Sequence, residues 1–258
     1  MTRDEIIQQI RAGKMTGTTS GLAPEYVQAN LVVVPAAYAA DVRGLCQRNP
    51  VPCPLVEELP TGAVEPRCAP GSDLRTDLPA YRLWIDGTLS ERRHDVRALW
   101  RDDLVAFLIG CSFTFEHALV DAGYRLRHQE LGRTVPMFRT NVPLAPSGRL
   151  HGRMVVSMRS FPAADVEGVR TVTRAYAEGH GEPVHWGDPA QLGIADINHP
   201  DEGDPIPLEA GEVPVFWGCG VTPQLVTIES KLPFVITHEP GSMFITALRH
   251  EALATTGS

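Results

Sequence analysis

The feature that most constrains this 258-residue chain is a local layout that occurs twice. Residues 104–109 form an apolar run that leads into Gly110-Cys111-Ser112, and residues 213–217 lead in the same way into Gly218-Cys219-Gly220. After the second turn, Thr222 and Pro223 are typical of an N-cap and a first helical residue. The repeated layout predicts two strand–turn–helix units, although periodicity alone leaves a helix open for residues 104–109.

Both turns are candidate functional sites. Backbone N–H groups at a helix start favour an anion, and they lower the pKa of a thiol placed there. We therefore expect Cys111 and Cys219 to take part in catalysis. The turn residues expected to bind substrate are Gly110, Ser112, Gly218 and Gly220. The alternative, which stays open, is a buried cysteine held in a turn that needs glycine for its shape.

Composition and charge limit the classes of partner. A net charge of -8 and the lack of any Lys/Arg-rich run argue against a nucleic-acid surface. The first residues lack the apolar core of a secretory signal, and no apolar run approaches the roughly 20 residues of a membrane span. Five cysteines without a CxxC pair favour free thiols in a reduced compartment. We expect a cytoplasmic protein that binds neither nucleic acid nor membrane.

Helical and strand-like segments are interleaved along the chain, which indicates an α/β or α+β fold with mixed strand pairing. Thr2 and Glu5 have the spacing of a capping box. The expected helices are residues 2–13, 35–48, 91–100, 113–122 and 162–178. The expected strands are residues 81–85, 135–141, 153–158, 213–217, 234–238 and 243–247. Residues 49–80 contain seven of the 22 prolines and are expected to run irregularly over the surface.

Arginine and histidine side chains supply further candidates. Arg139 and Arg159 lie in neighbouring predicted strands and are expected to bind a carboxylate, because a guanidinium holds it through two hydrogen bonds. Surface ion pairs are the alternative for either arginine. His185 and His238 are candidate general acids or bases, since imidazole titrates near neutral pH. The histidines and carboxylates of residues 180–201 match no zinc spacing, so no metal site is expected.

Several blocks of sequence resemble one family. The blocks are FLIGCSFTFE (107–116), VPMFRTN (135–141), VVSMRS (155–160), HGEPVHWGDP (180–189), VFWGCGVTPQ (215–224) and THEPGSMFIT (237–246). Together they resemble the hydro-lyase family of D-glutamate cyclase-like proteins, in order and over nearly the whole chain. The resemblance implies an α/β fold: an α/β/α layered domain with a mixed sheet and a smaller α+β domain. We assign residues 1–135 with 210–258 to the first and residues 136–209 to the second.

The resemblance also implies a reaction. The expected activity is loss of water from a small acidic metabolite, with cyclisation of D-glutamate to 5-oxoproline as the specific case, and no cofactor. The candidates for proton transfer are Cys111, Glu116, His185, Cys219 and His238. Outside the turns, the candidates for substrate binding are Arg139, Asn141, Arg159 and Gln224. A two-cysteine racemase, a non-catalytic binding protein and a homo-oligomeric assembly stay open.

Overall fold

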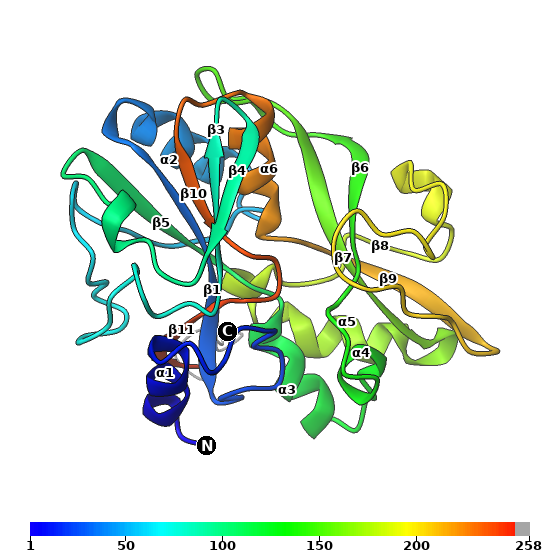
Figure 1. Cartoon of the computed structure of the whole chain (residues 1–258). Coiled ribbons are helices and arrows are strands. Elements are labelled where there is room, and N and C mark those ends of the chain that lie inside the picture. The colour runs from blue at the N-terminus through cyan, green and yellow to red at the C-terminus, as the bar shows by residue number, and fades with distance from the viewer. Residues whose placement is uncertain (251–258) are drawn as a thin grey trace.

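Two antiparallel sheets form the framework of residues 1–250, the part of the chain that the computed structural model describes (Figure 1). The strands of the larger sheet are β1 (Tyr26–Pro35), β2 (Leu55–Glu58), β3 (Tyr81–Ile85), β4 (Thr88–Arg93), β5 (Leu104–Gly110), β10 (Val235–His238) and β11 (Phe244–Arg249). The strands of the smaller sheet are β6 (Met137–Pro143), β7 (Arg153–Pro162), β8 (His185–Trp186) and β9 (Glu212–Gly218).

Helices pack on the faces of these sheets. The α-helices are α1 (Arg3–Arg11), α2 (Ala39–Arg48), α3 (Phe113–Asp121), α4 (Arg127–Glu130), α5 (Val166–Arg174) and α6 (Val221–Glu229). The 3-10 helices are η1 (Ala36–Tyr38), η2 (Arg97–Leu99), η3 (Ala163–Asp165), η4 (Ala177–Gly179) and η5 (Pro189–Leu192). Within residues 1–250 no helix has the length and apolarity needed to cross a bilayer.

The strand order confirms the α/β class and refines the pairing. The larger sheet runs β2-β5-β1-β10-β3-β4, with β11 also paired to β1, and the smaller sheet runs β6-β7-β9-β8. Every strand pair among the described residues is antiparallel, where mixed pairing was expected. The division into two domains stays a prediction. Strand β9, which lies outside residues 136–209, pairs with β7 in the smaller sheet.

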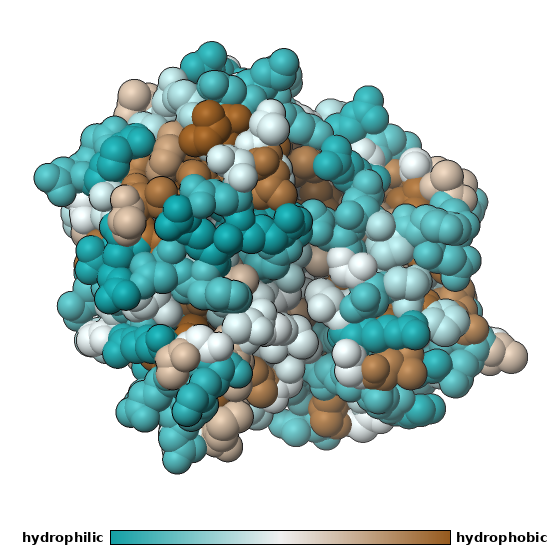
Figure 2. All heavy atoms as spheres, in the orientation of Figure 1, coloured by the Kyte–Doolittle hydropathy of each residue, from teal (hydrophilic) through white to brown (hydrophobic). Residues whose placement is uncertain are grey.

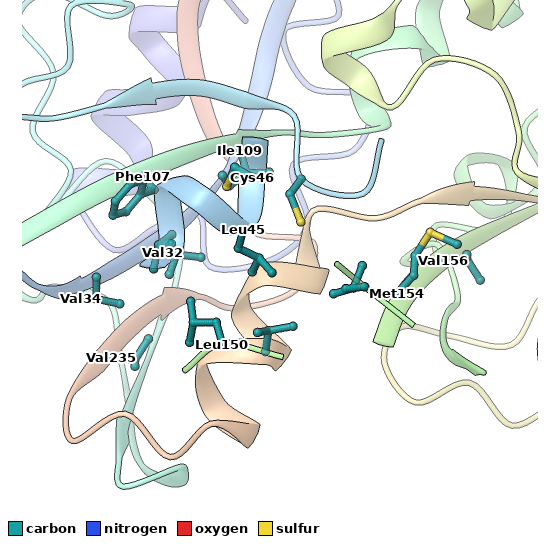
Figure 3. Close-up of a cluster of buried hydrophobic side chains, with 14 of the residues drawn as sticks. Val32, Val34, Leu45, Cys46, Phe107, Ile109, Leu150, Met154, Val156 and Val235 are labelled. Carbon is teal, nitrogen blue, oxygen red and sulfur yellow. The ribbon is translucent and has the colours of Figure 1, made fainter. Parts of the chain in front are cut away.

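Strand β1 lies at the centre of the larger sheet and is buried on both faces. Its side chains alternate: Val32 and Val34 join the core that contains α2, while Leu31 and Val33 join a core on the opposite face. Figure 3 shows the first of these cores, where side chains of β1 and β5 meet Leu45 of α2. The same core reaches Met154 and Val156 of β7, so it links the two sheets.

The proline-rich segment closes the opposite face of the larger sheet. Leu59, Leu74 and Leu78 are buried there against β1 and β5. The expectation that this whole segment runs over the surface is therefore wrong. Its irregular backbone carries apolar side chains inward at intervals that no helix or strand period would show.

Most predicted elements are confirmed, and the exceptions have physical causes. Thr2 and Glu5 form the capping box of α1, and residues 104–109 fall within strand β5. The helix expected over 91–100 is wrong, because Thr88–Arg93 is an exposed edge strand whose charged side chains imitate a solvated helix. Helix α6 begins at Val221, and Thr222 does not cap it. The hydroxyl of Thr222 instead accepts a hydrogen bond from the backbone N–H of Val155, 3.0 Å away.

Core packing around α2 predicts a matched pair of stability changes. Leu45 is fully buried, whereas Leu131 is 44% exposed. We expect Leu45→Ala to lower the free energy of unfolding by about 2–5 kcal/mol, because it leaves a cavity between α2 and the sheet. Leu131→Ala is expected to change it by less than about 1 kcal/mol. Urea unfolding followed by circular dichroism checks both values, and equal losses would contradict the assignment of this core.

Candidate active site

The two Gly-Cys turns meet at one small chamber. Its volume is about 20 Å³, room for about one water molecule. The polar and thiol side chains around it belong to Asn30, Cys111, Ser112, Cys219 and His238. The remaining lining residues are Phe113, Val135, Met137, Val221, Gly241 and Met243. Four sequence-predicted site residues, Cys111, Ser112, Cys219 and His238, are thus brought together from separate strands and turns.

Glycine is required where the two turns approach each other. A Cβ built on Gly220 would lie 1.9 Å from Nδ2 of Asn30 and 2.7 Å from the carbonyl oxygen of Gly110. A Cβ on Gly110 would lie 1.6 Å from the carbonyl oxygen of Glu178. Asn30 occupies the space between the turns, and its Nδ2 donates a 2.8 Å hydrogen bond to the Gly110 carbonyl. The glycines are therefore needed because the backbones approach closely. They are not needed for a left-handed conformation, since none of them has positive φ.

Burial keeps both thiols protonated. Desolvation raises the pKa of Cys111 far above its usual value, although the N–H of Phe113 lies 3.4 Å from its Sγ. Desolvation likewise raises the pKa of Cys219 to about 11. The expectation that the helix starts lower these pKa values is wrong, because the cost of burying a thiolate exceeds the effect of the backbone dipoles. Both sulfurs are proton donors at neutral pH, and neither is an activated nucleophile.

His238 is neutral, and its tautomer follows from its contacts. The backbone N–H of Leu31 donates to Nδ1 over 3.1 Å, and Nε2 of Gln224 lies 2.7 Å from the same nitrogen. Because Nδ1 accepts, the ring proton sits on Nε2. Desolvation lowers the pKa of His238 to about 4. The imidazole can therefore donate one hydrogen bond at physiological pH but carries no charge.

A larger groove lies beside the chamber, between the two sheets. Its volume is about 460 Å³, and Met137 and Val221 line both the groove and the chamber. Figure 2 shows apolar side chains within a hollow rimmed by hydrophilic ones, above α6 and between β4 and β6. Gln224 lines the groove and contacts His238, so the two spaces share a wall. An apolar groove with a few polar groups beside it is the usual form of a small-molecule site.

Arg82 is a site residue that the sequence analysis missed. It lines the groove, and its partner in the β3–β10 ladder, Thr237, immediately precedes His238. Its guanidinium donates to Glu202 over 2.7 Å and pairs also with Glu239. Its Nε is buried without a hydrogen-bond partner among the described residues. Asn30 was missed as well, although a buried asparagine within an apolar strand is a signal that could have found it.

Glu116 and Arg159 form a buried ion pair beside the chamber. Both side chains are at most 3% exposed, and Nε of Arg159 donates to Oε1 of Glu116 over 3.0 Å. His128 lies 2.9 Å from the same carboxylate. Burial opposes ionisation of Glu116, but His128 and Arg159 outweigh it and lower its pKa to about 2. Arg159 also donates to Oγ of Ser112 over 3.0 Å, so the pair orients a residue of the chamber.

The remaining sequence-predicted residues lie elsewhere. Arg139 is on the outer part of the groove, where it pairs with Asp201 and Glu229. Asn141 lines a neighbouring surface hollow together with Arg139. His185 stacks on Phe216 and contacts the backbone of Asp188, and it lines neither the groove nor the chamber. Arg139 and Arg159 therefore do not converge, because Arg159 is already committed to Glu116.

Metal-binding residues are not assembled at this site. Among residues 1–250, no three His, Cys, Asp or Glu side chains are grouped so that they could hold a metal ion. All five cysteines are free thiols. The chamber is consequently lined by uncharged polar groups: two thiols, one hydroxyl, one imidazole and the Asn30 amide, whose Nδ2 already donates to the carbonyls of Ile109 and Gly110.

Comparison with known proteins identifies the class. The sequence profile of the D-glutamate cyclase family matches residues 105–247. A protein from Bordetella petrii named "Putative hydro-lyase Bpet2233" is 51% identical over 95% of this chain and 94% of its own. A Stutzerimonas stutzeri protein named "Putative hydro-lyase" is 53% identical over 95% of this chain and 93% of its own. A protein from Rhodococcus jostii named "Putative hydro-lyase RHA1_ro03475" is 54% identical over 92% of this chain and 90% of its own.

The chain belongs to the D-glutamate cyclase family. The matched residues include both Gly-Cys turns, Glu116, Arg159 and His238. Asn30 and Arg82 precede the matched range and reach the site through strands β1 and β3.

The approach of the two turns predicts a selective effect at Gly220. We expect Gly220→Ala to displace Asn30 and to lower thermal stability by several degrees, because its Cβ would overlap Nδ2. Gly17→Ala is the matched control, since a Cβ there meets nothing within 4 Å. Differential scanning fluorimetry checks both variants. A Gly220→Ala protein as stable as Gly17→Ala would show that the turns are not packed this closely.

The buried ion pair predicts a specific response to acid. Glu116→Gln leaves the Arg159 guanidinium without its counter-charge, which is expected to cost about 3–5 kcal/mol of the free energy of unfolding at pH 7. The folded-state pKa of Glu116 is about 2, below its unfolded value of 4.5. The ionised Glu116 carboxylate therefore stabilises the folded protein fully above about pH 4.5, and this stabilisation is lost as the pH falls toward 2.

Unfolding free energies measured from pH 7 down to pH 3 test this linkage. The difference between native protein and Glu116→Gln is expected to shrink as the pH falls. A difference that stays constant with pH would rule out Glu116 as the titrating group.

Proposed function

We propose that this protein removes water from a small acidic metabolite, and that it cyclises D-glutamate to 5-oxoproline. The observation that carries the proposal is the small chamber that adjoins the groove through Met137 and Val221. It has room for about one oxygen atom and is lined by neutral hydrogen-bond donors. Such a chamber suits the γ-carboxyl oxygen that carries the negative charge of the tetrahedral intermediate and becomes the lactam oxygen, while the other oxygen of that carboxyl departs as water.

The reaction balances without an added acid, base or cofactor. The α-amine nitrogen bonds to the γ-carboxyl carbon, and one carbon–oxygen bond of that carboxyl breaks. The ammonium group loses two protons, and the departing oxygen gains two and leaves as water. The protein therefore has to relay protons and stabilise one oxyanion, and it need not supply any redox chemistry.

Four side chains of the chamber are assigned to the two oxygens of this carboxyl group. The Nε2–H of His238 donates to the oxygen that becomes the lactam oxygen, as a neutral electrophile, which a pKa of about 4 permits at every physiological pH. The protonated thiols of Cys111 and Cys219 line the same chamber and can pass a proton to the departing oxygen. Ser112, oriented by Arg159, completes the lining.

Arg82 is assigned to the α-carboxylate of the substrate. Of the two arginines expected to bind a carboxylate, Arg159 is committed to Glu116 and Arg139 pairs with Glu229 near the outer end of α6. Arg82 lies next to His238 in the sheet. Its Nε–H has no hydrogen-bond partner among the described residues, so it can donate to a ligand. A substrate carboxylate would replace Glu202 on this guanidinium.

The two alternatives fit the site less well. A two-cysteine racemase has to place a substrate carbon between its sulfurs and to ionise one of them. A chamber of about 20 Å³ holds no such carbon, and burial opposes a thiolate. A non-catalytic binding protein has no need for a closed chamber of proton donors beyond its ligand groove.

Conversion of D-glutamate tests the proposal. Purified protein is expected to form 5-oxoproline from D-glutamate, followed by proton NMR. We expect His238→Ala to lower kcat by roughly 10²–10³, the usual effect of removing one oxyanion donor. His199→Ala is the matched control, because His199 is 84% exposed and lies outside the groove. The proposal fails if the protein binds neither D-glutamate nor 5-oxoproline and dehydrates no dicarboxylic amino acid.

The pH profile separates the electrophilic role of His238 from a general base. Because the pKa of His238 is about 4, kcat is expected to show no inflection near pH 6.5. An inflection near 6.5 that disappears in His238→Ala would assign the imidazole to proton abstraction instead.

A further inference from the structure

The groove is longer than glutamate. Helix α6 forms one wall from Val221, at the chamber, to Ile228. Seven residues of α-helix span about 10 Å. The carbon chain of glutamate, four bonds of about 1.5 Å in a zigzag, spans about 5 Å from one carboxyl carbon to the other. With its γ-carboxyl group at the chamber, glutamate fills the inner half of the groove only.

The outer half has an apolar floor. Val221, Leu225 and Ile228 follow one another at helical spacing on the same face of α6, and all three stay partly exposed in the groove. The indole of Trp84 lines the groove as well, and its Nε1–H is taken by Thr237. These side chains suit an apolar group of a ligand, which free glutamate lacks.

The outer end carries an uncommitted cation. Lys231 lines the groove, and its ammonium group forms no ion pair with any described residue. Its backbone has φ of 51°, an unfavourable conformation for a lysine. Only one other lysine, Lys14, occurs in the sequence, against 21 arginines. The other cations of the groove, Arg82 and Arg139, already have carboxylate partners.

We propose that the groove takes an N-terminal glutamyl dipeptide, whose second residue lies along α6 and whose terminal carboxylate binds Lys231. The proposal rests on the proposed function, because the glutamyl end is assigned to the same chamber. In the dipeptide the carbonyl oxygen of the peptide bond takes the place of the α-carboxylate as the acceptor for Arg82. One added residue lengthens the ligand by about 3.5 Å. The distance from the γ-carboxyl carbon to the terminal carboxylate is then about 9 Å. The reaction is the same: nitrogen bonds to the γ-carboxyl carbon, water leaves, and the peptide bond stays intact.

Asp86 adds a selectivity for the second residue. It lines the same outer end as Lys231, and its carboxylate has no ion-pair partner among residues 1–250. Glu229 is also there, although Arg139 holds it. An acidic side chain on the second residue of the ligand would face the carboxylates of Asp86 and Glu229. The site therefore favours an apolar second residue such as leucine over aspartate.

Steady-state kinetics with three substrates test the inference. The substrates are D-glutamate, D-glutamyl-L-leucine and D-glutamyl-L-aspartate, with the 5-oxoproline ring detected by NMR. We expect kcat/KM to be at least tenfold higher for the leucine dipeptide than for D-glutamate, mainly through a lower KM. The aspartate dipeptide is expected to lose most of this advantage.

Variants of the two lysines locate the carboxylate. Lys231→Met is expected to lower the ratio of kcat/KM for the leucine dipeptide to that for D-glutamate about tenfold or more. Lys231→Arg keeps the positive charge and is expected to retain most of the ratio. Lys14→Met, outside the groove, is the matched control and should keep the native ratio.

The outcomes separate this inference from the proposed function. Turnover of D-glutamate with no advantage for the leucine dipeptide overturns the inference alone. No turnover of any of the three substrates overturns the proposed function and the inference with it. An advantage that survives in Lys231→Met places the terminal carboxylate elsewhere and also overturns the inference.

Discussion

The close contact of the two Gly-Cys turns through Asn30 is the constraint on which the site depends. Nδ2 of Asn30 bonds the carbonyl of Gly110 in the space that any side chain at position 220 would fill. Strand β1 carries Asn30 and is buried on both faces along nearly its whole length, so the amide is placed by a central strand of the larger sheet. The chamber is therefore a junction of both sheets, and its geometry is set by backbone approach more than by the thiols.

Charge is kept outside this chamber. Glu116 and Arg159 neutralise each other on one side, and Arg82 is balanced by Glu202 and Glu239 on the other. Between them, burial keeps Cys219 protonated and His238 neutral. Neutral donors in a closed space stabilise a developing negative charge without being solvated first, which is the usual basis of oxyanion stabilisation. The ionised pairs hold the donors in place.

Local patterns could be predicted from the sequence, and long-range contacts could not. The capping box of α1 and the strand before each Gly-Cys turn depend on residues close in sequence. The roles of Asn30 and Arg82 depend on partners 80 and 120 residues away. Cys111, Ser112, Cys219 and His238 were found because glycine, thiol and imidazole mark their segments. The commitment of Arg159 to Glu116 was not foreseen, because an arginine in a strand looks the same whether or not it is paired.

A crystal structure of the protein with 5-oxoproline is the most direct measurement of where the chemistry occurs. We predict that the lactam oxygen lies at the chamber, within hydrogen-bond distance of Nε2 of His238 and beside the sulfurs of Cys111 and Cys219, with the carboxylate on Arg82. Electron density for the ligand at the surface hollow beside Asn141, or anywhere outside the groove and chamber, would contradict this assignment of the site.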